Sequence, residues 1–75
     1  MNTEKLVRMA NQIAEFFGHE GAERGAASTA DHLQKFWEPR MRAELQAAVD
    51  AGRASDLKPL ALAAVRQLKP PHRPG

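Results

Sequence analysis

A shortage of large apolar side chains is the feature that most constrains how this chain can fold. Of its 32 hydrophobic residues 14 are alanine, so only 18 larger apolar side chains are available to 75 residues. The chain has no cysteine, which excludes disulfides and thiolate metal sites. Chains of this size usually depend on disulfides, a metal or association for stability. We therefore expect one small domain that is marginal as an isolated monomer and is stabilised by association.

Hydrophobic periodicity predicts helices throughout, and no stretch alternates as a strand does. The expected fold class is all-α, a small bundle of three to four short helices in a single domain over residues 1–69. The sequence predicts helices at about residues 3–17, 26–37, 39–51 and 57–69, with a connection at 19–25 and a disordered, proline-rich tail at 70–75.

The first predicted helix has a continuous apolar face. Asn2 or Thr3 is a suitable N-cap, and Gly18 stands where a left-handed residue commonly ends a helix. The face is expected to pack in the core or against a partner. Its members are Leu6, Met9, Ala10, Ile13, Phe16 and Phe17.

Proline separates the second and third predicted helices. Pro39 disfavours helical geometry at Glu38, so a new helix begins there or a single kinked helix continues from residue 26 to 51. Asp31 and Lys35 are spaced to pair across one turn, and Gly52 is expected to end the third helix. The apolar face of the second helix is predicted to contain Ala26, Ala30, Leu33, Phe36 and Trp37.

The fourth predicted helix includes Pro59 in its first turn. Leu62 lies opposite its apolar face, so this side chain is expected at the surface unless something covers it. The face itself is formed by Leu57, Leu60, Ala61, Ala64, Val65 and Leu68.

The segment 36–42 contains the strongest candidate for binding a partner. It places Phe36, Trp37, Arg40 and Arg42 at a corner made by proline. Tryptophan and arginine dominate interface hot spots, and both arginines oppose the helix dipole unless an acceptor offsets the cost. The alternative is that Trp37 anchors the core of this chain and both arginines are solvated, with Arg40 reaching Glu44.

Two polar residues and one leucine are further candidates for partner contacts. Asn11 and Gln12 interrupt the first helix at the edge of its apolar face, where their amides could bond a partner backbone. The alternative is that they form a solvated flank. Leu62 is ambiguous in the same way, because isolated exposed leucines are common.

The sequence offers little for catalysis, metals, membranes or nucleic acids. The three histidines stand at positions 19, 32 and 72, without the spacing that binds a metal from one helix face. His32, beside Asp31, is expected to be a helix-surface or interface imidazole. No apolar run could span a membrane, and no signal peptide is visible, so a cytoplasmic location is expected. A net charge of +2 is too weak to indicate nucleic-acid binding by itself.

Three segments resemble the delta subunit of NAD-dependent, molybdenum-containing formate dehydrogenase. They are Leu6-Val7-Arg8-Met9-Ala10-Asn11-Gln12-Ile13-Ala14-Glu15-Phe16-Phe17, Ala30-Asp31-His32-Leu33 and Phe36-Trp37-Glu38-Pro39-Arg40-Met41-Arg42. The resemblance extends through Leu57-Lys58-Pro59-Leu60 and covers about residues 3–68. Residues 19–25 are less typical of the family, and the tail carries no motif that can be transferred.

The resemblance implies a non-catalytic accessory subunit without a cofactor of its own, packed on the catalytic alpha subunit of a soluble complex. In that family the alpha subunit carries a molybdenum or tungsten bis-pyranopterin and iron–sulfur clusters. The beta and gamma subunits carry FMN and further clusters that pass electrons from formate to NAD⁺. The chain is then expected to fold fully only on its partner subunit. Phe36, Trp37, Arg40 and Arg42 are expected to anchor it, with the apolar face of the first helix and with Asn11, Gln12 and Leu62 as further contacts.

Three alternatives remain open at this point. The chain could be a transient assembly factor that handles the alpha subunit during cofactor insertion. It could be a homodimeric helical bundle, since exposed apolar faces can pair with themselves. It could also be a nucleic-acid-binding protein that uses basic residues in its second half, namely Arg40, Arg42, Arg53, Lys58, Arg66 and Lys69.

Overall fold

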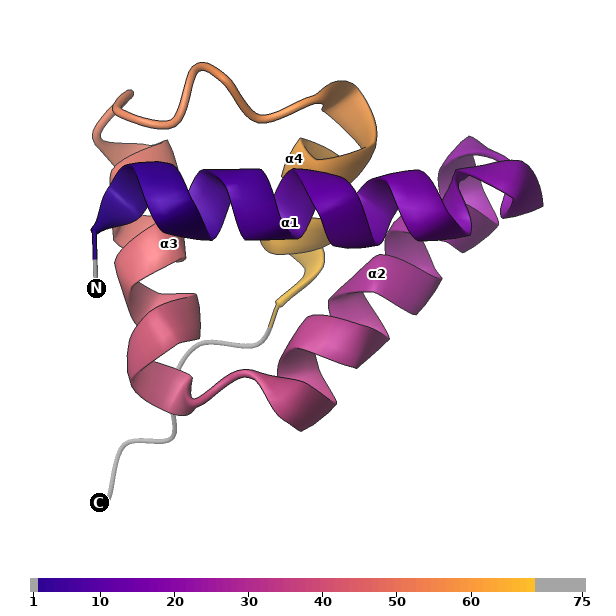
Figure 1. The fold of residues 1–75 in the computed structure, drawn as a ribbon, viewed down its shortest axis with the longest axis horizontal. Helices are drawn as coiled ribbons and strands as arrows, with labels where there is room; N and C mark the ends of the chain where they lie inside the picture. The colour runs from indigo at the N-terminus through magenta and orange to yellow at the C-terminus, as the bar shows by residue number, and fades with distance from the viewer. Residues whose placement is uncertain (1, 69–75) are drawn as a thin grey trace.

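The computed structural model describes residues 2–68, which form four α-helices and one short 3-10 helix and contain no strand. The all-α fold class predicted from sequence is therefore confirmed (Figure 1). The predicted tail at 70–75 and the last residue of the fourth predicted helix, Lys69, lie outside the described residues. The elements are α1 (Thr3–Phe17), η1 (Gly18–Glu20), α2 (Ala22–Phe36), α3 (Pro39–Asp50) and α4 (Pro59–Gln67).

Helix α1 begins with a side-chain cap and runs directly into η1. The Oδ1 atom of Asn2 accepts a hydrogen bond from the backbone N–H of Lys5 at 2.8 Å, which satisfies one of the free donors of the first turn. The expected left-handed conformation of Gly18 is wrong, since its φ is −60°. The chain continues instead through η1 and turns at Gly21, whose φ is +93°.

Helix α2 begins at Ala22, four residues before the predicted start, so the connection predicted at 19–25 is largely helical. Three glycines suggested a loop, but one of them is packed inside the helix. A Cβ atom on Gly25 would lie 2.9 Å from the backbone oxygen of Phe17 and 3.3 Å from the Leu60 side chain. Glycine lowers helix stability relative to alanine, but its missing side chain allows α1, α2 and α4 to approach each other closely at this point.

Helices α3 and α4 each begin with proline at the first helical position. The preceding residues, Glu38 and Lys58, are extended with ψ values of 148° and 157°, as expected before proline. Helices α2 and α3 are therefore separate rather than one kinked helix. For the same reason the predicted start of the fourth helix at residue 57 is wrong, and α4 begins at Pro59.

A glycine-dependent cap ends α3. Gly52 has a φ of +73°, and its N–H donates to the carbonyl of Val49 at 3.1 Å. The N–H of Arg53 donates to the carbonyl of Ala48 at 2.8 Å, which completes a Schellman motif. The chain is thereby turned out of α3 and into the connection that leads to α4.

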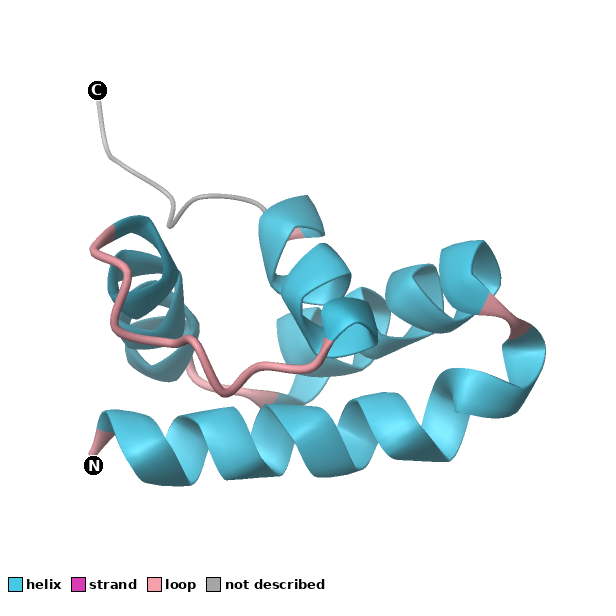
Figure 2. Ribbon diagram, turned by 90° about the horizontal axis from the view of Figure 1, so that it is seen from above, coloured by secondary structure: helices cyan, strands magenta, loops and turns pink. Residues whose placement is uncertain are grey.

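Helix α1 lies along one side of the molecule, and the other three helices lie on the same side of it (Figure 2). In Figure 1 it crosses in front of α4, with α3 at one end and α2 at the other. Eight of the sixteen buried hydrophobic residues among those described are alanine, which lets the helices approach closely. The largest fully buried side chains are those of Leu6, Leu33, Leu45, Val65 and Thr29.

Candidate partner-binding surface

The corner at 36–42 separates its two aromatic neighbours. Trp37 is 6% exposed and belongs to the core, which agrees with the alternative that it anchors this chain. Phe36 is 72% exposed. The apolar face predicted to contain both rings is therefore divided, because the chain leaves the helix at Trp37 and turns that residue inward.

Arg42 caps the C-terminal end of α2. Its Nη1 atom donates to the carbonyl oxygen of Gln34 at 3.1 Å and also to the carbonyl oxygen of Trp37. A cation at this end of a helix is favoured by the dipole and by the free carbonyls of the last turn. The acceptor needed to offset its unfavourable place in α3 is thus found within this chain. Arg40 is exposed.

Asn11 uses both ends of its amide within the chain. Its Nδ2 atom donates to the carbonyl oxygen of Asp56 at 3.0 Å, and its Oδ1 atom accepts from the N–H of Lys58 at 2.9 Å. These two bonds attach the connection between α3 and α4 to the middle of α1. The side chain therefore bonds within this chain through its Oδ1 atom and one of its two N–H groups.

The remaining candidates divide between the core and the surface. Leu62 is partly buried and packs against the core, so it is covered to a larger extent than a surface leucine. Gln12 is exposed. Of the seven residues predicted to bind a partner, the structure therefore leaves Phe36, Gln12 and Arg40 most accessible, on three different helices.

The most exposed large hydrophobic side chains among residues 2–68 are Phe16, at 71%, and Phe36, at 72%. A continuous row of aromatic rings connects them across α1 and α2. The ring centroids of Phe16 and Phe17 are 5.1 Å apart in an edge-to-face arrangement. Those of Phe17 and His32 are 6.1 Å apart, and those of His32 and Phe36 are 4.7 Å apart. We call this row of four residues the aromatic ladder.

The ladder borders an apolar hollow of about 340 Å³. A second hollow, of about 310 Å³, shares Phe17 and His32 with the first. It is also lined by Asp31 and Lys35, whose side chains form an ion pair at 3.0 Å. This pair was predicted from its spacing. The first hollow is lined by Gln12, Ile13, Phe16, Phe17 and His32.

The sequence predicted Phe16 on an apolar face for the core or a partner, and His32 at a helix surface or interface. It did not predict that both lie in one exposed surface, although part of the signal was present. At about 100° per residue, the apolar positions of α1 cover an arc of about 180°. The residues that it buries, Leu6, Val7, Ala10 and Ala14, occupy only about 100° of that arc. The excess width lies at Met9 and Ile13, which are partly buried against the core, and at Phe16, which is exposed.

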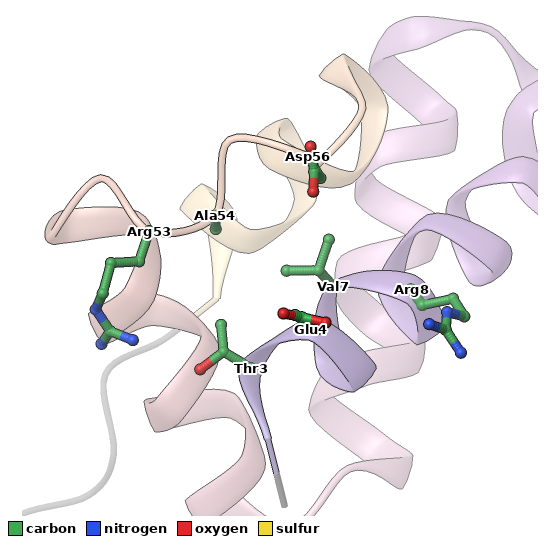
Figure 3. A pocket seen from close by; sticks show the side chains of 7 residues that line it. All are labelled: Thr3, Glu4, Val7, Arg8, Arg53, Ala54 and Asp56. Carbon is green, nitrogen blue, oxygen red and sulfur yellow. The ribbon is translucent and has the colours of Figure 1, made fainter.

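A groove of a different character lies near the start of α1. It has a volume of about 370 Å³ and runs between α1 and the connection after α3 (Figure 3). Arg53 and Arg8 stand at opposite ends of it, with Glu4 and the buried Val7 between them (Figure 3). Two cations and two carboxylates, including Asp56, line this groove, so its charges balance and it favours no ligand of one sign.

The described part of the chain shows no metal-binding cluster. No group of three or more histidine, aspartate or glutamate side chains within residues 2–68 is arranged to hold a metal ion. In the same range, no helix is long and apolar enough to pass through a bilayer. The chemistry that the folded residues do present is an exposed aromatic surface beside polar side chains, which is suited to protein association.

Comparison with known families decides the relationship. The family described as NADH-dependent formate dehydrogenase delta subunit FdsD matches residues 5–65. The chain belongs to this family. The resemblance read from the sequence segments is thereby confirmed. Searches of curated proteins and of solved structures gave no match.

Membership of the delta-subunit family implies that this chain has partner subunits in a formate dehydrogenase complex. The matched range contains all of α2 and α3 and most of α1 and α4. It therefore includes the aromatic ladder, the Arg42 cap and the Asn11 bonds. Each of these features belongs to the delta-subunit domain itself rather than to an added segment.

Proposed function

We propose that this chain is a non-catalytic accessory subunit that stabilises an NAD-dependent formate dehydrogenase by packing on its catalytic alpha subunit. The observation that carries the proposal is the delta-subunit family match over residues 5–65. The exposed phenylalanines support it, because a chain with so few large apolar side chains leaves two of them uncovered.

Phe36, Gln12 and Arg40 are the accessible contacts in this proposal. Trp37 and Arg42 act indirectly, because one fills the core and the other caps α2. They hold the corner that presents Phe36. Asn11 and the partly buried Leu62 likewise contribute through the fold of this chain.

The complex of this proposal is a cytoplasmic assembly of alpha, beta and gamma subunits with this chain. The molybdenum or tungsten bis-pyranopterin, the iron–sulfur clusters and FMN belong to those other subunits. They carry electrons from formate to NAD⁺, and this chain contributes contact surface rather than a redox group. Removing this chain is therefore expected to lower the stability of the complex to heating more than it lowers the initial rate of formate oxidation.

The test is purification of the dehydrogenase through a tagged alpha subunit, from cells with and without this chain. Native mass spectrometry gives the stoichiometry, and formate-dependent reduction of NAD⁺ is followed after heating for increasing times. We expect about one copy of this chain per alpha subunit, and faster loss of activity on heating when it is missing.

Two outcomes would overturn the stable-subunit role. If the chain is found only on cofactor-free alpha subunit and is missing from the active complex, it is a transient assembly factor. If it does not accompany the alpha subunit in either form, packing on that subunit is wrong. A matched strain that restores the chain from a plasmid controls for effects on neighbouring genes.

A further inference from the structure

We infer that the aromatic ladder is the docking surface of this chain, and that its occupant is an apolar patch on a larger subunit of the dehydrogenase. The inference rests on the proposed function and adds to it the contacting face and the chemistry of the partner. The four ladder residues come from the end of α1 and the second half of α2. Phe36 was predicted as a contact, and the apolar face of the first predicted helix, which includes Phe16 and Phe17, was expected in the core or against a partner. Their joining with His32 into one surface was not predicted.

The fold of the isolated chain gives no reason to leave the ladder uncovered. Half of the buried hydrophobic residues among those described are alanine, yet Phe16 and Phe36 remain 71% and 72% exposed. Burying an aromatic side chain is among the largest apolar contributions available to a small domain. Two phenylalanines left outside such a poor core indicate that something beyond the described residues 2–68 covers them.

The ladder is also held in place before any partner arrives. Phe17 and His32 are only partly buried, and they join the two exposed rings through ring contacts. The Nδ1 atom of His19 lies 3.1 Å from the carbonyl oxygen of Phe16 and can donate to it. Ordered aromatic side chains lose little conformational entropy on binding, which favours them as anchors.

The surroundings of the ladder determine what it can bind. The hollow of about 340 Å³ beside Phe16 and Phe17 could hold roughly two benzene-sized groups, since a cavity of about 150 Å³ holds one. Within residues 2–68 no charged side chain lines this hollow, and the two that line the second hollow, Asp31 and Lys35, neutralise each other. A charged side chain placed over the ladder would lose its hydration without gaining a counter-charge. The occupant is therefore expected to offer leucine, methionine or aromatic side chains.

The available area favours a larger partner over a second copy. An aromatic side chain has about 150–250 Å² of surface, so the exposed parts of Phe16 and Phe36 amount to roughly 300 Å². A stable interface buries about 800 Å² on each partner. Two ladders facing each other would fall well below this requirement. A large subunit can also cover the polar flanks, which include Gln12 and Lys35, and family membership supplies such subunits.

The test measures binding of the purified full-length chain to dehydrogenase purified from cells that lack it. The variants are Phe16→Ser and Phe36→Ser, and the matched control is Arg8→Ser, an exposed residue of α1 that borders the mixed-charge groove. We expect each phenylalanine variant to raise the Kd at least about tenfold, and Arg8→Ser to change it less than about twofold. Phe36→Leu should recover most of the affinity, because an apolar side chain is retained.

Three results separate the possible failures. Suppose that Arg8→Ser loses affinity while Phe16→Ser and Phe36→Ser bind as tightly as the unsubstituted chain. The docking face would then be the mixed-charge groove, and the ladder would be overturned. A stable dimer of the free chain in sedimentation, dissociated by Phe16→Ser, would make a second copy the occupant. Failure of the unsubstituted chain to bind the dehydrogenase would instead overturn the proposed function. Far-UV circular dichroism checks that each variant is folded. We expect all of them to fold, because the substituted side chains are exposed.

Discussion

The guanidinium group of Arg42, in the first turn of α3, donates to the carbonyl oxygen of Trp37 at the end of α2. The same Nη1 atom also donates to the carbonyl oxygen of Gln34. One cation therefore joins two helices across the proline corner, and it satisfies carbonyls that have no partner within α2. The buried Trp37 ring and the exposed Phe36 ring owe their opposite orientations to the corner that this contact holds.

The Arg42 cap gives the first prediction. Arg42→Met keeps most of the aliphatic stem but removes the donors, so we expect the free energy of unfolding to fall by about 1–2 kcal/mol. Arg40→Met is the control, and as an exposed substitution it should change stability by less than about 0.5 kcal/mol. Urea denaturation followed by circular dichroism measures both. Equal effects of the two substitutions would show that the cap does not stabilise the chain.

Adjacent aromatic residues should respond in opposite ways to truncation. Trp37→Ala removes a ring that is 6% exposed, and we expect a loss of about 3–5 kcal/mol, enough to unfold a marginal domain. Phe36→Ala removes a ring that is 72% exposed and should change the melting temperature by only a few degrees. Thermal melts of both variants check this. Release of the Trp37→Ala chain from a complex would therefore report unfolding, and a stable Trp37→Ala chain would contradict its place in the core.

The two hydrogen bonds of Asn11 predict a local change in the connection between α3 and α4. Asn11→Ala should free the N–H of Lys58 and the carbonyl of Asp56, at a cost of about 1–2 kcal/mol. Hydrogen exchange at the Lys58 amide should then become faster than in the unsubstituted chain. Gln12→Ala, at the neighbouring exposed position, is the control and should leave that amide unchanged. Unchanged exchange in Asn11→Ala would show that other contacts hold the connection.

Substitution of Gly25 by alanine should change stability in the direction opposite to that expected from helix propensity. Gly25→Ala should favour the helix by about 1 kcal/mol on propensity alone, but the added Cβ would lie 2.9 Å from the Phe17 carbonyl oxygen. We expect net destabilisation of about 1 kcal/mol or more, because backbone must move to relieve the overlap. The matched control is Ala27→Gly, at an exposed position of α2, which should cost about 1 kcal/mol through propensity. Urea denaturation compares the two, and stabilisation by Gly25→Ala would rule out the close approach.

Local chemistry determined much of the helical pattern. Proline excludes helical geometry at the residue before it, so Pro39 and Pro59 define helix starts wherever the rest of the chain lies. The Asn2 cap and the left-handed Gly52 act over three or four residues in the same way. Such features can be read from the sequence because the interacting groups are close together in the chain.

Only the tertiary structure decided which side chains face outward. Phe36 and Trp37 are adjacent and both apolar, and the sequence contained no local reason for one to be buried and the other exposed. The partners of Asn11 lie 45 and 47 residues away, and the value of Gly25 depends on the approach of α1 and α4. These outcomes depend on contacts between distant segments, which local propensity does not encode. The ladder is continuous for the same reason, because its contact between Phe17 and His32 forms only when α1 and α2 pack together.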